Sequence, residues 1–219
     1  YNPASSAPDD IVGIGQSLRY LLEQMVLGGE RLVGQLSLLD AGQQRVQQAW
    51  NATATPYPLD CSVQRLIEAQ VVKTPDACAL VFAGHRLSYA ALNAQANQLA
   101  HVLMEQGVGP DVLVGIAVER SVEMVVGLLA ILKAGGAYVP LDPEYPQDRL
   151  AYMFEDSGIG LLLTQRHLLE QLPLPAGLRS LVLDQPGDWL AGRSEANPVV
   201  ELSGENLAYV IYTSGSTGK

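Results

Sequence analysis

Cysteine and histidine are scarce in this chain of 219 residues, which contains two cysteines and three histidines. No Cys-x-x-Cys, His-x-His or His-Glu-x-x-His spacing is present, so the sequence offers no metal-binding motif. We interpret Cys61 and Cys78 as free thiols in a reducing compartment and therefore expect a cytoplasmic location. Apolar residues make up 48% of the chain and charged residues only 16%, which is typical of a globular protein with a sizeable core.

Basic clusters and long apolar runs are also missing. The 13 basic and 23 acidic residues give a net charge of −10, and the acids are scattered along the chain. Nucleic-acid binding needs clustered Lys and Arg, so we expect no nucleic-acid partner. The longest apolar stretch, 124–132, is far shorter than the roughly 20 residues of a membrane span, and we expect no membrane role. The absence of both an initial Met and a signal-peptide pattern indicates a piece of a longer protein.

The first 62 residues predict a short helical segment followed by a linker. A helical stripe covers residues 14–27, and we expect Gly28-Gly29 to end it in a left-handed cap. A second helix is expected at about 40–50, with Asp40 and Gln43 as a capping box. Two prolines and small polar residues then deny regular structure to residues 51–58, which makes this stretch the best domain boundary.

Short strands and helices alternate after the linker, which predicts an α/β fold. Helices are expected at about 62–72, 88–106, 122–133 and 149–156, and strands at 77–82, 86–88, 112–118, 137–141, 159–164, 178–183 and 207–213. The unalternating apolar strands predict parallel β-α-β units buried on both faces. We place Asn93, Gln95, Asn97 and Gln98 on the polar face of the helix at 88–106, and Glu155-Asp156 at a solvated helix end.

The last residues of the chain carry its most informative motif. A β-prone run leads into Thr213-Ser214-Gly215-Ser216-Thr217-Gly218, in which every residue is glycine or a small hydroxyl residue. Glycines let consecutive N–H groups converge on one anion, and the hydroxyls add further donors, so the run is suited to holding phosphate. A Walker loop would require glycine where Thr213 stands, and no Gly-x-Gly-x-x-Gly is present. The alternative is an ordinary Ser- and Gly-rich turn between a strand and a helix.

Three segments together resemble one family. Residues 207–218 resemble the phosphate-loop signature of nonribosomal peptide synthetase adenylation domains, and residues 132–143 and 87–92 are similar to two further signatures in the family's order. Residues 32–39 and 50–53 resemble the end of a condensation domain, although an epimerisation domain could end similarly. The resemblance implies condensation-domain helices at 1–50, an interdomain linker at 51–62, and at 63–219 the N-terminal part of an adenylate-forming (acyl-CoA synthetase/luciferase-like) large subdomain.

The resemblance also implies a reaction. The complete domain would use ATP with Mg²⁺ to convert an amino acid into aminoacyl-AMP and pyrophosphate, and would load it on a carrier-protein phosphopantetheine thiol. Its partners would be the condensation and carrier domains of the same synthetase. The resemblance implies hydroxyl contacts to phosphate from Thr213, Ser214, Ser216 and Thr217, and close backbone approach at Gly215 and Gly218.

Several assignments stay open. Lys219 falls on a variable position of the family motif, and no residue of the chain is assigned a catalytic role. The family's amino-acid pocket and lid lysine lie beyond the motif, so we expect this chain alone to be inactive. An acyl-CoA synthetase shares the glycine loop, but residues 137–140 and the condensation-like stretch argue against it. A noncatalytic interdomain scaffold is the second alternative.

Overall fold

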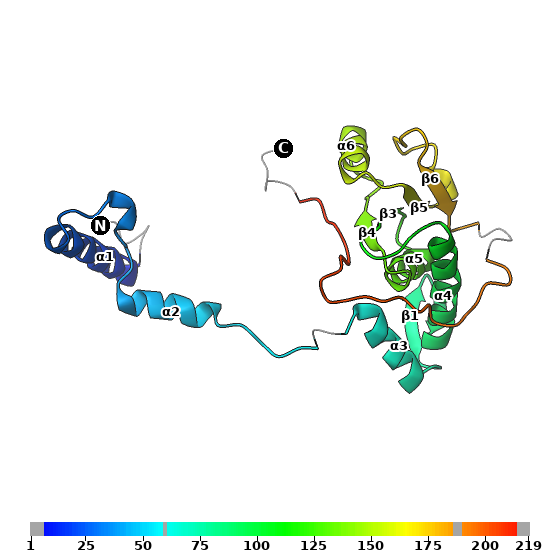
Figure 1. Ribbon diagram of the computed structural model, residues 1–219, viewed down its shortest axis with the longest axis horizontal. Coiled ribbons are helices and arrows are strands. Elements are labelled where there is room, and N and C mark those ends of the chain that lie inside the picture. The colour runs from blue at the N-terminus through cyan, green and yellow to red at the C-terminus, as the bar shows by residue number, and fades with distance from the viewer. Residues whose placement is uncertain (1–6, 59–60, 186–189, 214–219) are drawn as a thin grey trace. The chain divides into compact units, whose positions relative to one another are not determined.

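The computed structural model describes residues 7–58, 61–185 and 190–213. Contacts divide the chain into two units, Tyr1–Tyr57 and Pro58–Lys219. The division falls inside the proline-containing stretch at 51–62 (Figure 1). Among the described residues, no helix combines the length and apolar character needed to cross a bilayer.

The first unit consists of α1 (Pro8–Leu27), the 3-10 helix η1 (Val33–Gln35) and α2 (Ala41–Asn51). The helix predicted at 14–27 begins earlier, because Pro8 suits the first helical turn and acidic residues follow it. The capping box of α2 is confirmed: Asp40 Oδ1 accepts from the Gln43 N–H at 2.8 Å, and Gln43 Oε1 accepts from the Asp40 N–H at 3.0 Å. No described residue of this unit is buried.

The left-handed cap predicted at the end of α1 is wrong. Gly28 has a φ of −116°, and its N–H donates to the Gln24 carbonyl at 2.9 Å. A Cβ at this position would lie 2.9 Å from both the Gln24 oxygen and the Arg31 Cδ. Close approach of the backbone, not a positive φ, is therefore what glycine provides here.

The second unit begins with a helix and a hairpin. Helix α3 (Val63–Lys73) precedes strands β1 (Cys78–Phe82) and β2 (His85–Ser88), which pair antiparallel. Ala83 and Gly84 in the turn have φ values of +47° and +83°. A two-residue turn with both φ values positive matches the right-handed twist of the strands, and it joins the two strands predicted at 77–82 and 86–88 into a hairpin.

Four parallel strands form the central sheet, in the order β4-β3-β5-β6. They are β3 (Leu113–Ala117), β4 (Ala137–Pro140), β5 (Leu161–Thr164) and β6 (Arg179–Val182). The helices of the unit after α3 are α4 (Tyr89–Glu105), α5 (Val122–Lys133), α6 (Gln147–Ser157) and the 3-10 helix η2 (Arg166–Leu168). The predicted β-α-β unit is confirmed by the parallel pairing of β3 and β4 across α5.

Two apolar cores cover the two faces of this sheet. On one face, α4 and α5 pack against alternate residues of β3 and β5, such as Ile116 and Leu163. On the other face, α6 packs through Leu150 and Phe154 against residues that include Leu162. Figure 1 shows the helices on both sides of the strands. Burial on both faces explains why the strands read as continuous apolar runs.

One residue of the predicted polar face of α4 is buried. Asn97 is 0% exposed, because the chain around Asn197 lies over this part of the helix. The Asn97 Nδ2 donates to the Glu195 carbonyl at 2.6 Å and to Asn197 Oδ1 at 2.9 Å. The expectation of a solvated position was wrong for Asn97 because a segment 100 residues later in the sequence covers it.

The strand predicted at 207–213 is reduced to a single parallel bridge between Tyr138 of β4 and Tyr209. The Tyr138 N–H donates to the Ala208 carbonyl at 3.2 Å, and the Val210 N–H donates to the Tyr138 carbonyl at 3.0 Å. Leu207 and Ile211 remain 47% and 55% exposed. Within the described residues this segment pairs only with β4 and at one bridge, so the regular strand predicted at 207–213 is not formed.

Candidate functional site

A cleft opens at the carboxyl ends of β3 and β4. In the sheet, β4 lies on one side of β3 and β5 lies on the other, so the strand order changes direction at β3. Open parallel sheets bind their ligands at the carboxyl ends of the strands beside such a change of direction. The cleft has a volume of about 650 Å³ and an apolar floor that includes Met124, Leu128 and Leu141. Its rim carries the carboxylates of Glu119, Asp142 and Glu144 and the guanidinium of Arg120. This charge balance favours a cation over a bare phosphate group.

The segment that leads to the glycine loop, residues 206–212, is called the approach segment. It runs along β4 towards the same edge of the sheet. Thr213 is the only predicted phosphate contact among the described residues. It follows Tyr209 by four positions, just as Asp142 follows its bridge partner Tyr138 by four positions. Parallel chains advance together, so this register directs Thr213 towards the carboxyl ends of the strands. The other predicted site residues, Ser214, Gly215, Ser216, Thr217 and Gly218, and also Lys219, lie outside the described residues.

Asp111 holds the start of this approach. Its Oδ1 accepts from the Leu207 N–H at 2.8 Å, and its Oδ2 accepts from the Asn206 side-chain amide at 3.0 Å. Asp111 is one of two non-glycine described residues with positive φ, at +62°. Asp tolerates this left-handed conformation better than most residues. In this conformation both carboxylate oxygens of Asp111 accept hydrogen bonds from the segment.

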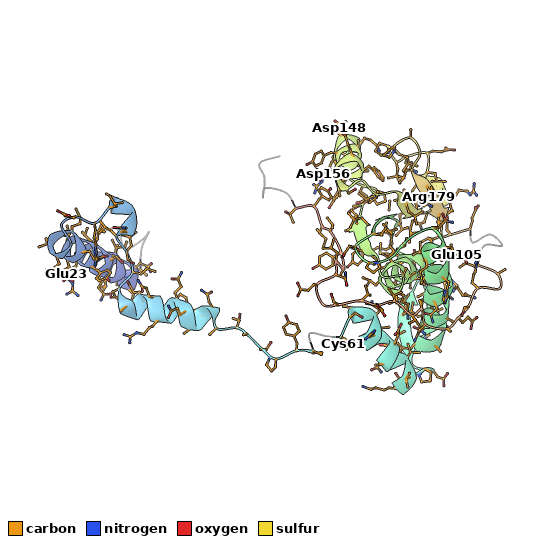
Figure 2. All side chains as sticks on the ribbon, viewed as in Figure 1. Glu23, Cys61, Glu105, Asp148, Asp156 and Arg179 are labelled. Carbon is orange, nitrogen blue, oxygen red and sulfur yellow. The ribbon has the colours of Figure 1, made fainter. Side chains whose placement is uncertain are left out.

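The end of the approach is held by Tyr212. Its hydroxyl donates to Asp156 Oδ2 on α6 at 2.6 Å, and its ring meets that of Tyr152 edge-on at 6.2 Å. Burial, and then the hydrogen bond to Asp156, raise the pKa of Tyr212 to about 12, so its hydroxyl stays a donor at neutral pH. Asp156, labelled on α6 in Figure 2, therefore has a partner instead of being only a solvated helix end.

A partly buried polar cluster fixes the chain upstream of the approach segment. The Lys133 ammonium, at the end of α5, pairs with Glu68 of α3 and donates to Asn197 Oδ1 at 3.2 Å. Asn197 Oδ1 also accepts from Asn93 and Asn97 of α4, each at 2.9 Å. Burial lowers the pKa of Lys133, while the hydrogen bond and charge of Glu68 oppose that shift. The cluster ties three helices to the segment around Asn197.

Sequence reasoning did not find these three anchors. Asp111 and Leu207 are 96 residues apart, and Tyr212 and Asp156 are 56 residues apart. No local pattern links such pairs.

Among the described residues no group of three or more His, Cys, Asp or Glu side chains is arranged to hold a metal ion.

Comparison with known proteins decides the family. The model of the AMP-binding enzyme family matches residues 67–219, which include the parallel sheet, the approach segment and the glycine loop. This chain belongs to the AMP-binding enzyme family. The family assignment covers the second unit of the chain almost completely.

Curated relatives of this AMP-binding chain are peptide synthases. It is 48% identical to one component of the linear gramicidin synthase of Brevibacillus parabrevis over 93% of this chain, and 45% identical to tyrocidine synthase 3 of the same organism over 91% of this chain. It is 45% identical to chondramide synthase cmdD of Chondromyces crocatus over the full length of this chain. The chain spans only 3%, 3% and 6% of the lengths of these three relatives, respectively.

Solved structures agree. The AMPPNP-bound form of the nonribosomal peptide synthetase FmoA3 matches with a TM-score of 0.77 and 33% identity, over 95% of this chain and 22% of FmoA3. The N-terminal subdomain of Klebsiella oxytoca NpsA matches with a TM-score of 0.63 and 25% identity, over 74% of this chain and 41% of NpsA. These matches confirm the predicted α/β fold of an adenylate-forming subdomain and the resemblance to peptide synthetase adenylation domains.

Proposed function

We propose that this chain is the N-terminal part of an adenylation domain that activates an amino acid with ATP and passes the acyl group to a carrier-domain phosphopantetheine thiol. The observation that supports it most is the approach segment, which runs parallel to β4 and leads into the glycine- and hydroxyl-rich run from Thr213 to Gly218. A solved relative, the form of FmoA3 bound to alpha-methyl-L-serine-AMP, supports an amino-acid substrate.

The reaction sets a charge problem that the loop is suited to meet. A substrate carboxylate oxygen attacks the α-phosphorus of ATP, and the bond from that phosphorus to the oxygen bridging to the β-phosphorus breaks. The products are the acyl adenylate and pyrophosphate. Donors aimed at the phosphates lower the cost of bringing two anions together. We assign hydroxyl contacts to Thr213, Ser214, Ser216 and Thr217, and close backbone approach to Gly215 and Gly218.

Mg²⁺ fits this proposal as an ion that arrives with ATP. The described residues provide no three-ligand cage, and Mg²⁺ commonly keeps several waters and binds through substrate phosphates. When bound, it would neutralise phosphate charge. The acidic rim of the cleft, Glu119, Asp142 and Glu144, offers oxygen ligands or water-mediated contacts on the protein side.

The first unit is proposed as the end of a condensation domain at 1–50, followed by a linker at 51–62. Its described helices expose large apolar side chains that a free-standing surface does not need: Val26, Leu27 and Trp50 are 81%, 87% and 76% exposed. Such surfaces are typical of helices that pack on a neighbouring domain. The match to FmoA3 over 95% of this chain also reaches into this unit.

A cytoplasmic location is also proposed for the protein, supported by the free thiols of Cys61 and Cys78.

Amino-acid-dependent exchange of pyrophosphate into ATP tests the proposed function. The full-length protein that contains this chain is assayed with each proteinogenic amino acid and with a panel of fatty acids. We expect exchange with one or a few amino acids, and its loss when Ser214 and Ser216 are both replaced by Ala. Ser194→Ala, which removes a hydroxyl from a surface segment outside the loop, is the matched control.

Two results would contradict the proposal. Exchange with fatty acids alone would identify an acyl-CoA synthetase type of enzyme. An absence of exchange with every substrate, while the protein stays folded, would favour a noncatalytic scaffold.

A further inference from the structure

The approach to the phosphate loop is weakly held by the sheet itself. Its single bridge to β4, among the described residues, is at Tyr209, and the Val210 N–H donates to the Tyr138 carbonyl at 3.0 Å. A regular parallel strand would continue this ladder along β4. Beyond Val210, the Tyr212 hydroxyl supplies a side-chain hydrogen bond that ties the segment to α6.

Tyr212 is placed where an anchor has the most effect on the loop. It directly precedes Thr213, the first residue of the glycine- and hydroxyl-rich run. Its ring packs against the core under α6, and its hydroxyl reaches Asp156 Oδ2 at 2.6 Å. Packing fixes the position of the ring, and the hydrogen bond fixes its direction. Together they fix the backbone from which Thr213 leaves.

Asp156 accepts hydrogen bonds from both tyrosines of one aromatic pair, which suits it to hold Tyr212 in place. Its Oδ2 accepts from Tyr212, and its Oδ1 accepts from Tyr152 of the same helix at 3.4 Å. The two rings meet edge-on, with an interplanar angle of 83°. A charged acceptor makes the shorter of these bonds stronger than a neutral pair would be.

We propose that Asp156, acting through the Tyr212 hydroxyl, is a positioning residue that sets where the chain enters the phosphate-binding loop. It touches no reacting atom, and its effect is transmitted by one hydrogen bond to the residue before Thr213. This inference rests on the proposed function, because it assigns the loop to the phosphates of ATP.

Steady-state exchange kinetics of the full-length protein test the inference with four single variants and one double variant. Tyr212→Phe removes only the hydroxyl, and Asp156→Ala removes the acceptor. Asp156→Asn keeps one acceptor oxygen without the charge. Glu155→Gln makes the same change of charge on the neighbouring, exposed residue of α6 and serves as the control.

We expect Tyr212→Phe and Asp156→Ala each to raise the KM for ATP by about three- to tenfold, the range expected for loss of one charge-assisted hydrogen bond that is partly exposed. Asp156→Asn should recover part of that loss. The KM for the amino acid should stay at the wild-type value, and Glu155→Gln should match the wild type throughout. The double variant Tyr212→Phe with Asp156→Ala should be no worse than the more affected single variant, because both substitutions remove the same Tyr212–Asp156 hydrogen bond.

Hydrogen–deuterium exchange gives a readout independent of activity. Amides of residues 213–219 should exchange faster in Tyr212→Phe than in Glu155→Gln, with the sheet unchanged in both. Equal exchange rates with unchanged KM values would overturn the inference, as would an equal rise in both KM values with a lower thermal midpoint, which indicates a general structural defect. A wild-type protein without exchange activity would instead refute the proposed function, and with it the inference.

Discussion

The buried ion pair between Lys133 and Glu68 should respond very differently to loss of one partner or the other. The Lys133 side chain is 0% exposed, whereas that of Glu68 is 21% exposed. Replacing Glu68 by Met leaves an ammonium group buried without its counter-ion, which costs about 3–5 kcal/mol of unfolding free energy. Replacing Lys133 by Met leaves a carboxylate that water can reach, so we expect a smaller loss of about 1–2 kcal/mol.

The Asn197 side chain explains why the second loss stays small. Its Oδ1 accepts from Lys133 at 3.2 Å, and it keeps the two shorter bonds from Asn93 and Asn97 when the lysine is removed. The variant with Met at both Lys133 and Glu68 should therefore recover most of the loss caused by Glu68→Met. Met preserves length and helix propensity at both sites, so the comparison isolates the charges.

The pH dependence supplies a second, independent check. Burial already lowers the pKa of Lys133 from its ordinary value of 10.5, and Glu68→Met removes the only two effects that raise it. Between this lowered pKa in the folded state and 10.5 in the unfolded state, the unfolded chain binds more protons. Unfolding free energy therefore rises with pH in that window. The stability gap between Glu68→Met and the double variant should narrow as pH approaches 10.5.

Urea unfolding followed by far-ultraviolet circular dichroism measures these differences, and equal m values confirm that the same structure unfolds in each variant. Two results would refute the reasoning. One is an equal loss for both single variants, and the other is a gap that does not change with pH.

Three smaller perturbations follow from local geometry, each read from urea unfolding. Ser88→Ala should cost about 1 kcal/mol, because the Ser88 hydroxyl caps α4 by accepting from the Ala91 N–H at 3.2 Å. Gly135→Ala should cost about 1–3 kcal/mol, because Gly135 has a φ of +89° and a Cβ there would lie 2.9 Å from Val200 Cγ1. Tyr212→Phe should flatten the loss of stability at alkaline pH: the wild-type tyrosine has its pKa raised from 10.0 to about 12, so its contribution is complete below pH 10 and is lost as pH rises through about 12. A Phe variant with the wild-type alkaline profile would contradict the last expectation.

Local signals in the sequence predicted most of the second unit. The strands at 77–82 and 86–88, the helix at 88–106 and the β-α-β unit around α5 each depend on neighbouring residues, and each is confirmed. Where expectations for this second unit were wrong, contacts with distant parts of the chain decided the outcome. Asn97 is buried by the chain around Asn197, and the apolar run at 207–213 pairs with β4 at one bridge only.

The anchors of the candidate site lay beyond sequence reasoning for a related reason. Asp111 and Asp156 look like ordinary surface acids in the sequence, since an Asp after Gly-Pro or near a helix end is common on protein surfaces. Their function depends on which chain segment arrives beside them. Only the fold brings Leu207 to Asp111 and Tyr212 to Asp156.

The contacts that fix the position of the approach segment differ from those that stabilise the sheet. A strand paired on both sides gains its position from the same backbone ladder that stabilises the fold, so neither can change alone. Here one bridge at Tyr209 is flanked by side-chain contacts from Asp111 and Asp156, which lie on different elements. Substitutions at these two carboxylates can shift the segment without removing a strand from the core. The entry to the phosphate loop is therefore adjustable by residues that bear little of the folding free energy.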